Sequence, residues 1–184
     1  MNKSIFIKNL ILGCFAVVSM GALTRCAEEF ESPEPVTGIT LAEVAAADTT
    51  LQIFTAAIAK TGIGISLGNI NSGQHTVFAP TDSAFRAYFQ PIIGGGPGDV
   101  AIVNYVSNLS SSSNPTLAAF ITRLQYHIIS SAKPAADIMN SQVFTTINSA
   151  RLSLSKSGGT VYVNANAGAN GAKVRVADLE GANG

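Results

Sequence analysis

Few residues in this chain have the types and spacing that metal binding or cofactor chemistry needs. The candidate ligands are two cysteines, Cys14 and Cys26, and two histidines, His75 and His127. A lone histidine with no second His or Cys nearby is more often a hydrogen-bonded residue than a metal ligand. The glycine-rich stretches at 94–98 and 166–171 lack the Lys-Ser or Lys-Thr ending of a phosphate-binding loop. We therefore expect neither a metal nor a cofactor.

Catalytic chemistry is not indicated either. The chain has many serines, but no Gly-x-Ser-x-Gly nucleophile motif and no evident oxyanion-hole loop. Acidic residues such as Asp82 and Asp178 are too scattered to nominate an acid–base pair. The sequence therefore favours a non-catalytic protein in which His127 is a hydrogen-bonded core residue. An enzyme that uses His127 is kept only as an alternative to be eliminated.

The composition indicates a small, weakly charged globular protein. The chain has 184 residues, with 11 Lys and Arg against 11 Asp and Glu, and 47% of its residues are hydrophobic. Such a chain can bury a substantial core, which argues against wholesale disorder. It has no basic excess to neutralise phosphates, so we expect no nucleic-acid partner.

Residues 1–25 have the pattern of a secretory signal peptide. Lys3 and Lys8 precede an apolar run from Leu10 to Leu23, and small residues lie near its end. The run is shorter than the roughly 20 apolar residues that span a bilayer. We therefore expect this segment to direct export.

The sequence around Cys26 indicates a lipid anchor. Leu23-Thr24-Arg25-Cys26 resembles the cleavage box of bacterial lipoproteins, in which the Cys becomes the lipidated first residue, although Arg25 replaces a small residue. A box ending at Cys14 matches locally, but cleavage there would leave an apolar stub behind it. We expect acylation of Cys26 and a membrane partner through that anchor. Ordinary signal cleavage near residues 19–21, which would release a soluble protein, is the alternative.

A short acidic segment, residues 26–38, follows the expected cleavage site. Residues 27–35 read AEEFESPEP, with no apolar periodicity, so they predict a stiff, solvated tether. An acidic tract after a lipidated Cys also resembles the surface-export signal of some Gram-negative lipoproteins. The expected location is the outer membrane or cell surface, and otherwise the protein is secreted or periplasmic.

Residues 39–184 are expected to form one α+β domain, with helices first and a strand meander after them. Thr40 and Glu43 have capping-box spacing, and Thr81 and Asp82 are expected to cap a helix. Expected helices cover about 41–47, 50–60, 82–89, 99–109 and 115–124. Expected strands cover 76–78, 143–147, 151–155, 160–163 and 173–177. The serine run at 110–113 and the stretches 62–73, 91–98 and 164–171 are expected to be loops or connectors.

Three separated motifs resemble the fasciclin-domain family. They are TVFAPTDSAF at 76–85, YHII at 126–129 and, at the end, VRVADL at 174–179 with ANG at 182–184. The resemblance implies an α+β fold in which several helices pack on a wedge of mostly antiparallel strands. Family members continue past Asn-Gly into a final apolar strand, whereas this sequence stops at Gly184. We therefore expect a C-terminally incomplete domain whose open sheet edge favours weak self-association.

The resemblance also implies where a partner would bind. In animal members of the family, a Tyr-His segment and an Asp-Ile segment are implicated in integrin contact, and the matching residues here are Tyr126, His127, Asp137 and Ile138. Ile138 could equally be a core anchor. The expected function is a cell-envelope-anchored or secreted adhesion or matrix-interaction module whose partner is an extracellular protein or polysaccharide. A glycan-binding accessory protein of the cell envelope is the alternative.

Overall fold

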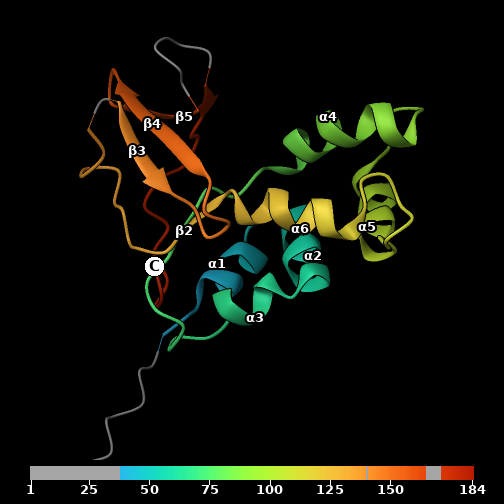
Figure 1. Cartoon of the computed structure of the whole chain (residues 1–184), viewed down its shortest axis with the longest axis horizontal. Coiled ribbons are helices and arrows are strands. Elements are labelled where there is room, and N and C mark those ends of the chain that lie inside the picture. The colour runs from blue at the N-terminus through green and yellow to red at the C-terminus, as the bar shows by residue number, and fades with distance from the viewer. Residues whose placement is uncertain (1–37, 140, 165–170) are drawn as a thin grey trace, which may run out of the picture. The chain divides into compact units, whose positions relative to one another are not determined.

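The computed structural model describes residues 38–139, 141–164 and 171–184 (Figure 1). The chain divides into two units, residues 1–34 and 35–184, and every described residue belongs to the second. The expected signal peptide, Cys26 and the tether up to residue 37 lie outside the described residues. The middle of the expected loop at 164–171 also lies outside them.

The described residues contain six helices. They are α1 (Leu41–Ala47), α2 (Gln52–Thr61), α3 (Ile63–Leu67), α4 (Asp82–Ile93), α5 (Asp99–Ser107) and α6 (Leu117–Gln125). The capping box predicted before α1 is confirmed, because Glu43 N–H donates to Thr40 Oγ1 at 3.3 Å and Thr40 N–H donates to Glu43 Oε2 at 2.7 Å. The Thr40 N–H and then the Thr40 hydroxyl, which lies 2.8 Å from Glu43 Oε2, donate to the Glu43 carboxylate and lower its pKa.

The described residues also form two small antiparallel sheets, and this mixture of helices and strands confirms the α+β prediction. The first sheet pairs β1 (Thr76–Val77) with β2 (Ile128–Ile129). The second has the order β3-β4-β5-β6, with β3 at Gln142–Thr145, β4 at Arg151–Ser157, β5 at Thr160–Val163 and β6 at Ala172–Lys173. An isolated bridge between Ile129 and Thr146 links the two sheets.

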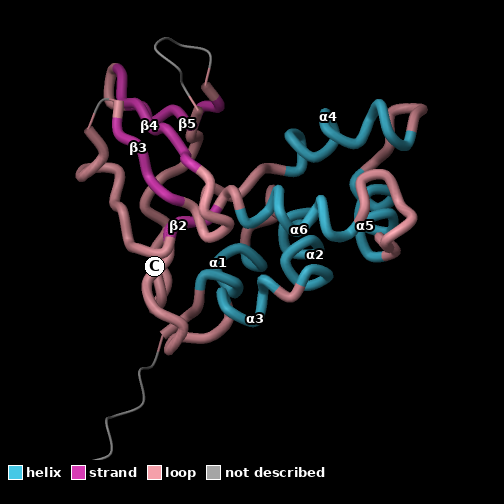
Figure 2. Tube along the Cα trace, in the orientation of Figure 1, coloured by secondary structure: helices cyan, strands magenta, loops and turns pink. Residues whose placement is uncertain are grey.

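Two hydrophobic clusters stabilise these layers. The larger one lies among the helices and is centred on residues fully removed from solvent, including Ile53, Phe89, Ile102 and Phe120. The smaller one lies on the sheet and is built from Ile129, Ile138, Leu152, Leu154 and Val161. Alternation along β4 directs Leu152 and Leu154 to the same buried face. Figure 2 shows the helices gathered in one part of the described unit and strands β3, β4 and β5 in another.

Several element predictions were wrong. The stretch 62–73 was expected to be a connector, but it contains α3, in which Ile63 and Leu67, one helical turn apart, are buried while Ile65 is 79% exposed. Helix α4 continues through Pro91 to Ile93 instead of ending before the expected loop. The strand expected at 173–177 is reduced to β6, which pairs only with Tyr162 and Val163 of β5.

Asp82 connects two helices instead of capping its own. Thr81 is the N-cap residue of α4, but its side chain makes no capping bond. The buried Asp82 Oδ1 instead accepts the N–H of Ile53 at 2.9 Å, and its own N–H donates to Thr50 O at 2.8 Å. Helix α2 has Leu51 at its N-cap, which offers no side-chain acceptor, so Asp82 satisfies an N–H that would otherwise have no partner. The start of α4 is thereby joined to the start of α2.

Asn183 connects three segments that are far apart in the sequence. Its side chain is 0% exposed, its Oδ1 accepts the N–H of Leu41 at 2.9 Å, and its Nδ2 donates to Leu67 O at 3.0 Å and to Asn69 O at 3.3 Å. Its main-chain carbonyl accepts the N–H of His75 at 2.9 Å. The Asn-Gly pair of the closing motif therefore holds together the start of α1, the end of α3 and the approach to β1.

Candidate functional site

An open groove of about 470 Å³ lies beside helices α4 and α6. Its apolar lining comes from the residues Pro80, Ala84, Phe85, Phe120 and Leu124. Its other lining residues are Tyr88, Thr122, Arg123, Tyr126, His127 and Asn148. The groove therefore brings the expected Tyr-His pair together with residues of the TVFAPTDSAF motif.

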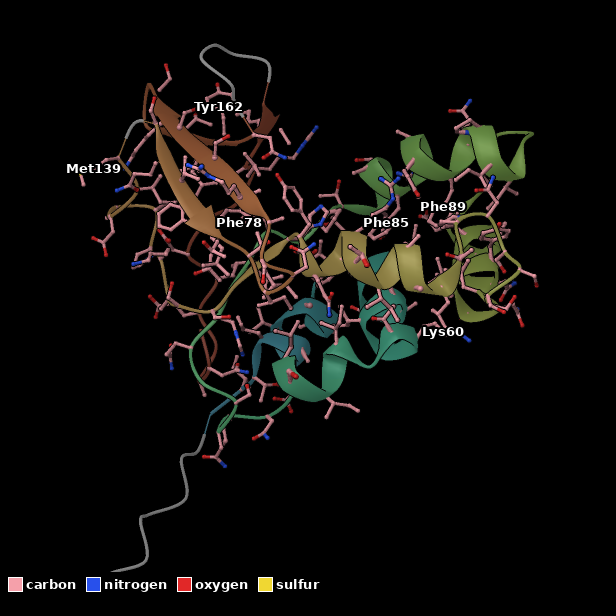
Figure 3. All side chains as sticks on the ribbon, in the orientation of Figure 1. Lys60, Phe78, Phe85, Phe89, Met139 and Tyr162 are labelled. Atoms are coloured by element: carbon pink, nitrogen blue, oxygen red, sulfur yellow. The ribbon has the colours of Figure 1, made fainter. Side chains whose placement is uncertain are left out.

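The floor of the groove is a packed aromatic layer. Phe85 and Phe120 are both buried, and each packs on Phe89, with ring centroids 6.3 Å and 6.0 Å away. Figure 3 shows Phe85 and Phe89 between α4 and α6. Because the apolar face of α4 is directed at α6, the helical spacing of these phenylalanines creates the floor.

The positively charged side chain of Arg123 lines the same groove as this apolar floor. The Arg123 guanidinium lies over the Tyr88 ring, with Cζ 5.4 Å from the ring centroid. In the part of the chain that the structure describes, the ion pair found is Arg86–Asp99, so the exposed Arg123 has no carboxylate partner there. Arg123 thus presents an uncompensated positive charge beside an apolar surface.

His127 presents one ring nitrogen for recognition. Its Nδ1 lies 2.8 Å from Arg123 O, and because a carbonyl only accepts, Nδ1 carries the proton and donates. Nε2 is then the acceptor of the neutral ring. Burial lowers the pKa of His127 below 6.5, and the bond to Arg123 O opposes this shift without cancelling it. The ring is therefore neutral at pH 7.

Tyr126 is fixed by the sheet. Its hydroxyl lies 2.8 Å from Asn164 Oδ1 and 3.1 Å from Arg151 O, two acceptors at the ends of β5 and β4. Its ring stands at 90° to the His127 ring, with centroids 6.3 Å apart. The Tyr-His pair is therefore held in one orientation by contacts with both α6 and the sheet.

The lowered pKa of His127 makes stability depend on pH. The unfolded chain binds a proton at His127 near its ordinary pKa, whereas the folded chain binds it only at lower pH, so the domain is destabilised as the pH falls through this interval. We expect the free energy of unfolding, measured with urea at several pH values, to fall more steeply below about pH 6.5 in the native chain than in His127→Gln. An NMR titration of His127 at or above pH 6.5 would contradict this.

The structure separates the second expected segment from the groove. Ile138 is only 4% exposed and packs in the sheet cluster, whereas Asp137 is exposed, and neither residue lines the groove. Partner contact by these two residues stays a prediction, and Ile138 would influence it through the packing of its loop.

Four groove residues were not singled out from the sequence: Tyr88, Arg123, Asn148 and Thr122. Tyr88 follows Phe85 by three residues, and Arg123 precedes His127 by four. These helical spacings were the available signals for the first two. Asn148 joins the groove because its Nδ2 donates to Thr122 O at 2.9 Å, a long-range bond that no local pattern shows.

A smaller cavity of about 210 Å³ lies on the other side of α6 and is lined partly by Gly62, Ile63, Gln125 and His75. His75 is half-buried, and its Nδ1 is a buried atom without a hydrogen-bond partner among the described residues. Its Nε2 lies 3.3 Å from Ser72 Oγ. The segment before β1 is held against Asn183 by the bond from His75 N–H to Asn183 O, which keeps His75 half-buried.

No metal or membrane-spanning element accompanies the groove in the described part of the chain. Within these residues, no three His, Cys, Asp or Glu side chains come together in a way that could hold a metal ion. None of the helices at 38–139, 141–164 or 171–184 combines the length and apolarity needed to cross a bilayer.

The helices and the two antiparallel sheets define an α+β domain. A family model, the Fasciclin domain, matches residues 49–184, and the chain belongs to this family. No curated protein sequence matches the chain. Fasciclin domains are adhesion or extracellular interaction modules, typically secreted and generally non-catalytic, and this is the class in which the chain falls.

Proposed function

We propose that this protein is an adhesion module displayed at the cell envelope or secreted, and that it binds an extracellular partner through the groove beside Tyr126 and His127. The observation that carries the proposal is the position of the groove. It is lined in part by residues of the TVFAPTDSAF and YHII segments of this fasciclin domain, and it combines a buried aromatic floor with Arg123, which has no carboxylate partner among the described residues. Aromatic residues and arginine are the side chains that carry most binding energy at protein interfaces.

Adhesion can be tested on beads. Cys26 is the only cysteine in residues 26–184, so this part of the chain can be coupled to beads through a single thiol. Coated beads are expected to be retained on cells or extracellular matrix, and soluble protein should compete. Retention on a glycan array without retention on cells or matrix would instead support the glycan-binding alternative.

Two matched variants test whether the groove is the binding surface. Ala84 is exposed and lines the groove, whereas Ala87 is exposed on the same helix and does not line it. Glutamate is tolerated at helix surfaces, so Ala84→Glu and Ala87→Glu should both fold. Bead retention should be lost in Ala84→Glu and kept in Ala87→Glu. Equal retention in both variants would contradict the assignment of the groove.

The lipid anchor makes a separate prediction. If Cys26 is acylated, its lipid holds the protein in the membrane fraction and the acidic tether projects the domain outward. Cys26→Ala should move the protein from the membrane fraction to the soluble fraction, as measured by fractionation and immunoblotting. Unchanged membrane retention would contradict the anchor but not adhesion, because a secreted module can also bind a partner.

A further inference from the structure

The chemistry of the groove narrows the occupant to one class of ligand. Its floor of Phe85, Phe120 and Leu124 offers no hydrogen-bonding side chain, so it can be covered favourably only by an apolar group. An aromatic group can also meet the Phe rings edge to face. The first requirement on the ligand is therefore an aromatic or aliphatic side chain.

The second requirement is an anion close to that side chain. Arg123 is held over Tyr88 and has no carboxylate partner among the described residues, so its guanidinium is already oriented and its charge is uncompensated. A carboxylate is the group that a planar guanidinium binds with two parallel hydrogen bonds. Because the main-chain carbonyl of Arg123 already holds His127, the helix end that carries Arg123 is also fixed.

The third requirement is a hydrogen-bond donor. His127 Nδ1 donates to Arg123 O, which leaves Nε2 as an acceptor at neutral pH. Asn148 does not compete for the ligand, because its Nδ2 donates to Thr122 O and its Oδ1 accepts the N–H of Ala150 at 3.2 Å. The groove thus offers the donor fork of Arg123 and the acceptor of His127, together with the Tyr88 hydroxyl, which has no internal hydrogen bond among the described residues.

We propose that the groove binds an acidic, apolar peptide segment: an aromatic or aliphatic side chain lies on the floor, a neighbouring Asp or Glu carboxylate pairs with Arg123, and a peptide N–H donates to His127 Nε2. This inference rests on the proposed function and names the partner chemistry of the same groove. A fatty acid has the apolar body and the carboxylate but no donor. An acidic polysaccharide has carboxylates and hydroxyls, but the C–H faces of its sugar rings are a smaller and more polar cover for the floor than an aromatic or aliphatic side chain.

The test measures peptide binding to the full chain by calorimetry. The probe is a capped peptide, Gly-Glu-Phe-Asp-Gly, and its two controls replace both acids by their amides or replace Phe by Gly. The acidic probe should bind about tenfold more tightly than the amide control, because a charge-assisted pair beside an apolar surface is formed only with the acid. Loss of Phe should abolish detectable binding.

A double-mutant cycle assigns this difference to Arg123. Arg123→Gln keeps the main-chain bond to His127. This variant should bind the acidic probe about tenfold more weakly, while its affinity for the amide control should stay nearly unchanged. Arg175→Gln is the matched control, since Arg175 is exposed and does not line the groove, and it should bind as the native chain does. Equal affinity for the acidic and amide probes, or an equal loss in both arginine variants, would overturn the inference.

Further outcomes separate this inference from the proposed function. Binding of oleate vesicles or of an oligogalacturonate at the groove, without binding of the peptide, would overturn the peptide assignment. If beads adhere in a manner that depends on Ala84 but not on Arg123, the groove is an adhesion site with another partner chemistry. If native beads never adhere while the peptide binds, the peptide assignment stands and the adhesion proposal fails.

Discussion

Replacing Asn183 by alanine should lower the free energy of unfolding by about 2 to 4 kcal/mol, because the change leaves buried backbone groups without partners. The Asn183 side chain is completely buried and serves the N–H of Leu41 and the carbonyls of Leu67 and Asn69. A water molecule could restore these bonds only by occupying the space that the lost amide leaves. Urea unfolding should therefore show a lower midpoint with an unchanged slope.

An aspartate at the same position tests the hydrogen-bond explanation more sharply. Asn183→Asp keeps an acceptor for Leu41 N–H, but its charged form faces two carbonyl oxygens without a donor. Burial raises the pKa of such a carboxyl, so the Asp variant should lose stability relative to the Ala variant as the pH rises above about 4.

The matched control for both variants is Asn71→Ala, because Asn71 is exposed. This change should alter stability by less than about 0.5 kcal/mol. A loss in Asn71→Ala as large as that in Asn183→Ala would contradict the role assigned to Asn183.

Sequence patterns that cover a few residues predicted structural features that depend only on residues close together in the chain. The capping box of Thr40 and Glu43 needs only residues three positions apart, and it is present as expected. The stripes of α2, α4, α5 and α6 were visible because each helix buries one face against the same core. Local signals were right for these helices and wrong for α3, for the end of α4 beyond Pro91 and for the strand expected at 173–177.

Long-range partners could not be predicted from spacing. A capping role was expected for Asp82, but its side chain accepts from Ile53, 29 residues earlier, because α2 begins without a capping side chain of its own. The helix expected to start at Asn114-Pro115 begins at Leu117, with Thr116 Oγ1 accepting the N–H of Ala119 at 3.3 Å. Only the Asp82 bond depends on how distant elements pack. The Thr116 cap is local, and the Asn114-Pro115 pair was preferred to it when the start of the helix was placed.

The candidate site was also predicted only in part from local sequence, because the rest depends on long-range packing. Tyr126 and His127 were found through a motif, but their surroundings come from α4, α6 and the loop at Asn148, which meet only in the folded chain. Arg123 was visible as a helix residue, yet its place over Tyr88, and its lack of an ion partner in the part of the chain that the structure describes, are properties of the fold. The motif located the site, and the packing defines what it can bind.

The second large effect is expected at Phe89, and it links the core to this site. Phe89 is 0% exposed, and besides Phe85 and Phe120 it packs against Tyr88 and Tyr105, with centroids 4.9 Å and 5.6 Å away. Its ring thus joins α4, α5 and α6. Phe89→Ala should cost about 3 to 5 kcal/mol in unfolding free energy, the sum of lost burial and the cavity left behind.

Phe89→Leu should cost less, about 1 to 2 kcal/mol, because leucine refills most of the volume but not the ring contacts. Gln90→Ala, at the exposed neighbouring position, is the matched control and should stay within about 0.5 kcal/mol of the native chain. Similar losses in the Ala and Leu variants would indicate that ring geometry, not volume, dominates this core.

Phe89 does not line the groove, yet its truncation should also weaken binding there. Phe85 and Phe120 form the floor and rest on the Phe89 ring, so a cavity beneath them lets both rings move and removes the preorganised surface on which an apolar side chain would lie. Under conditions in which Phe89→Ala is still folded, its affinity for the acidic probe peptide should fall, while that of Gln90→Ala stays native. Unchanged affinity in folded Phe89→Ala would mean that the floor is positioned by α4 and α6 alone.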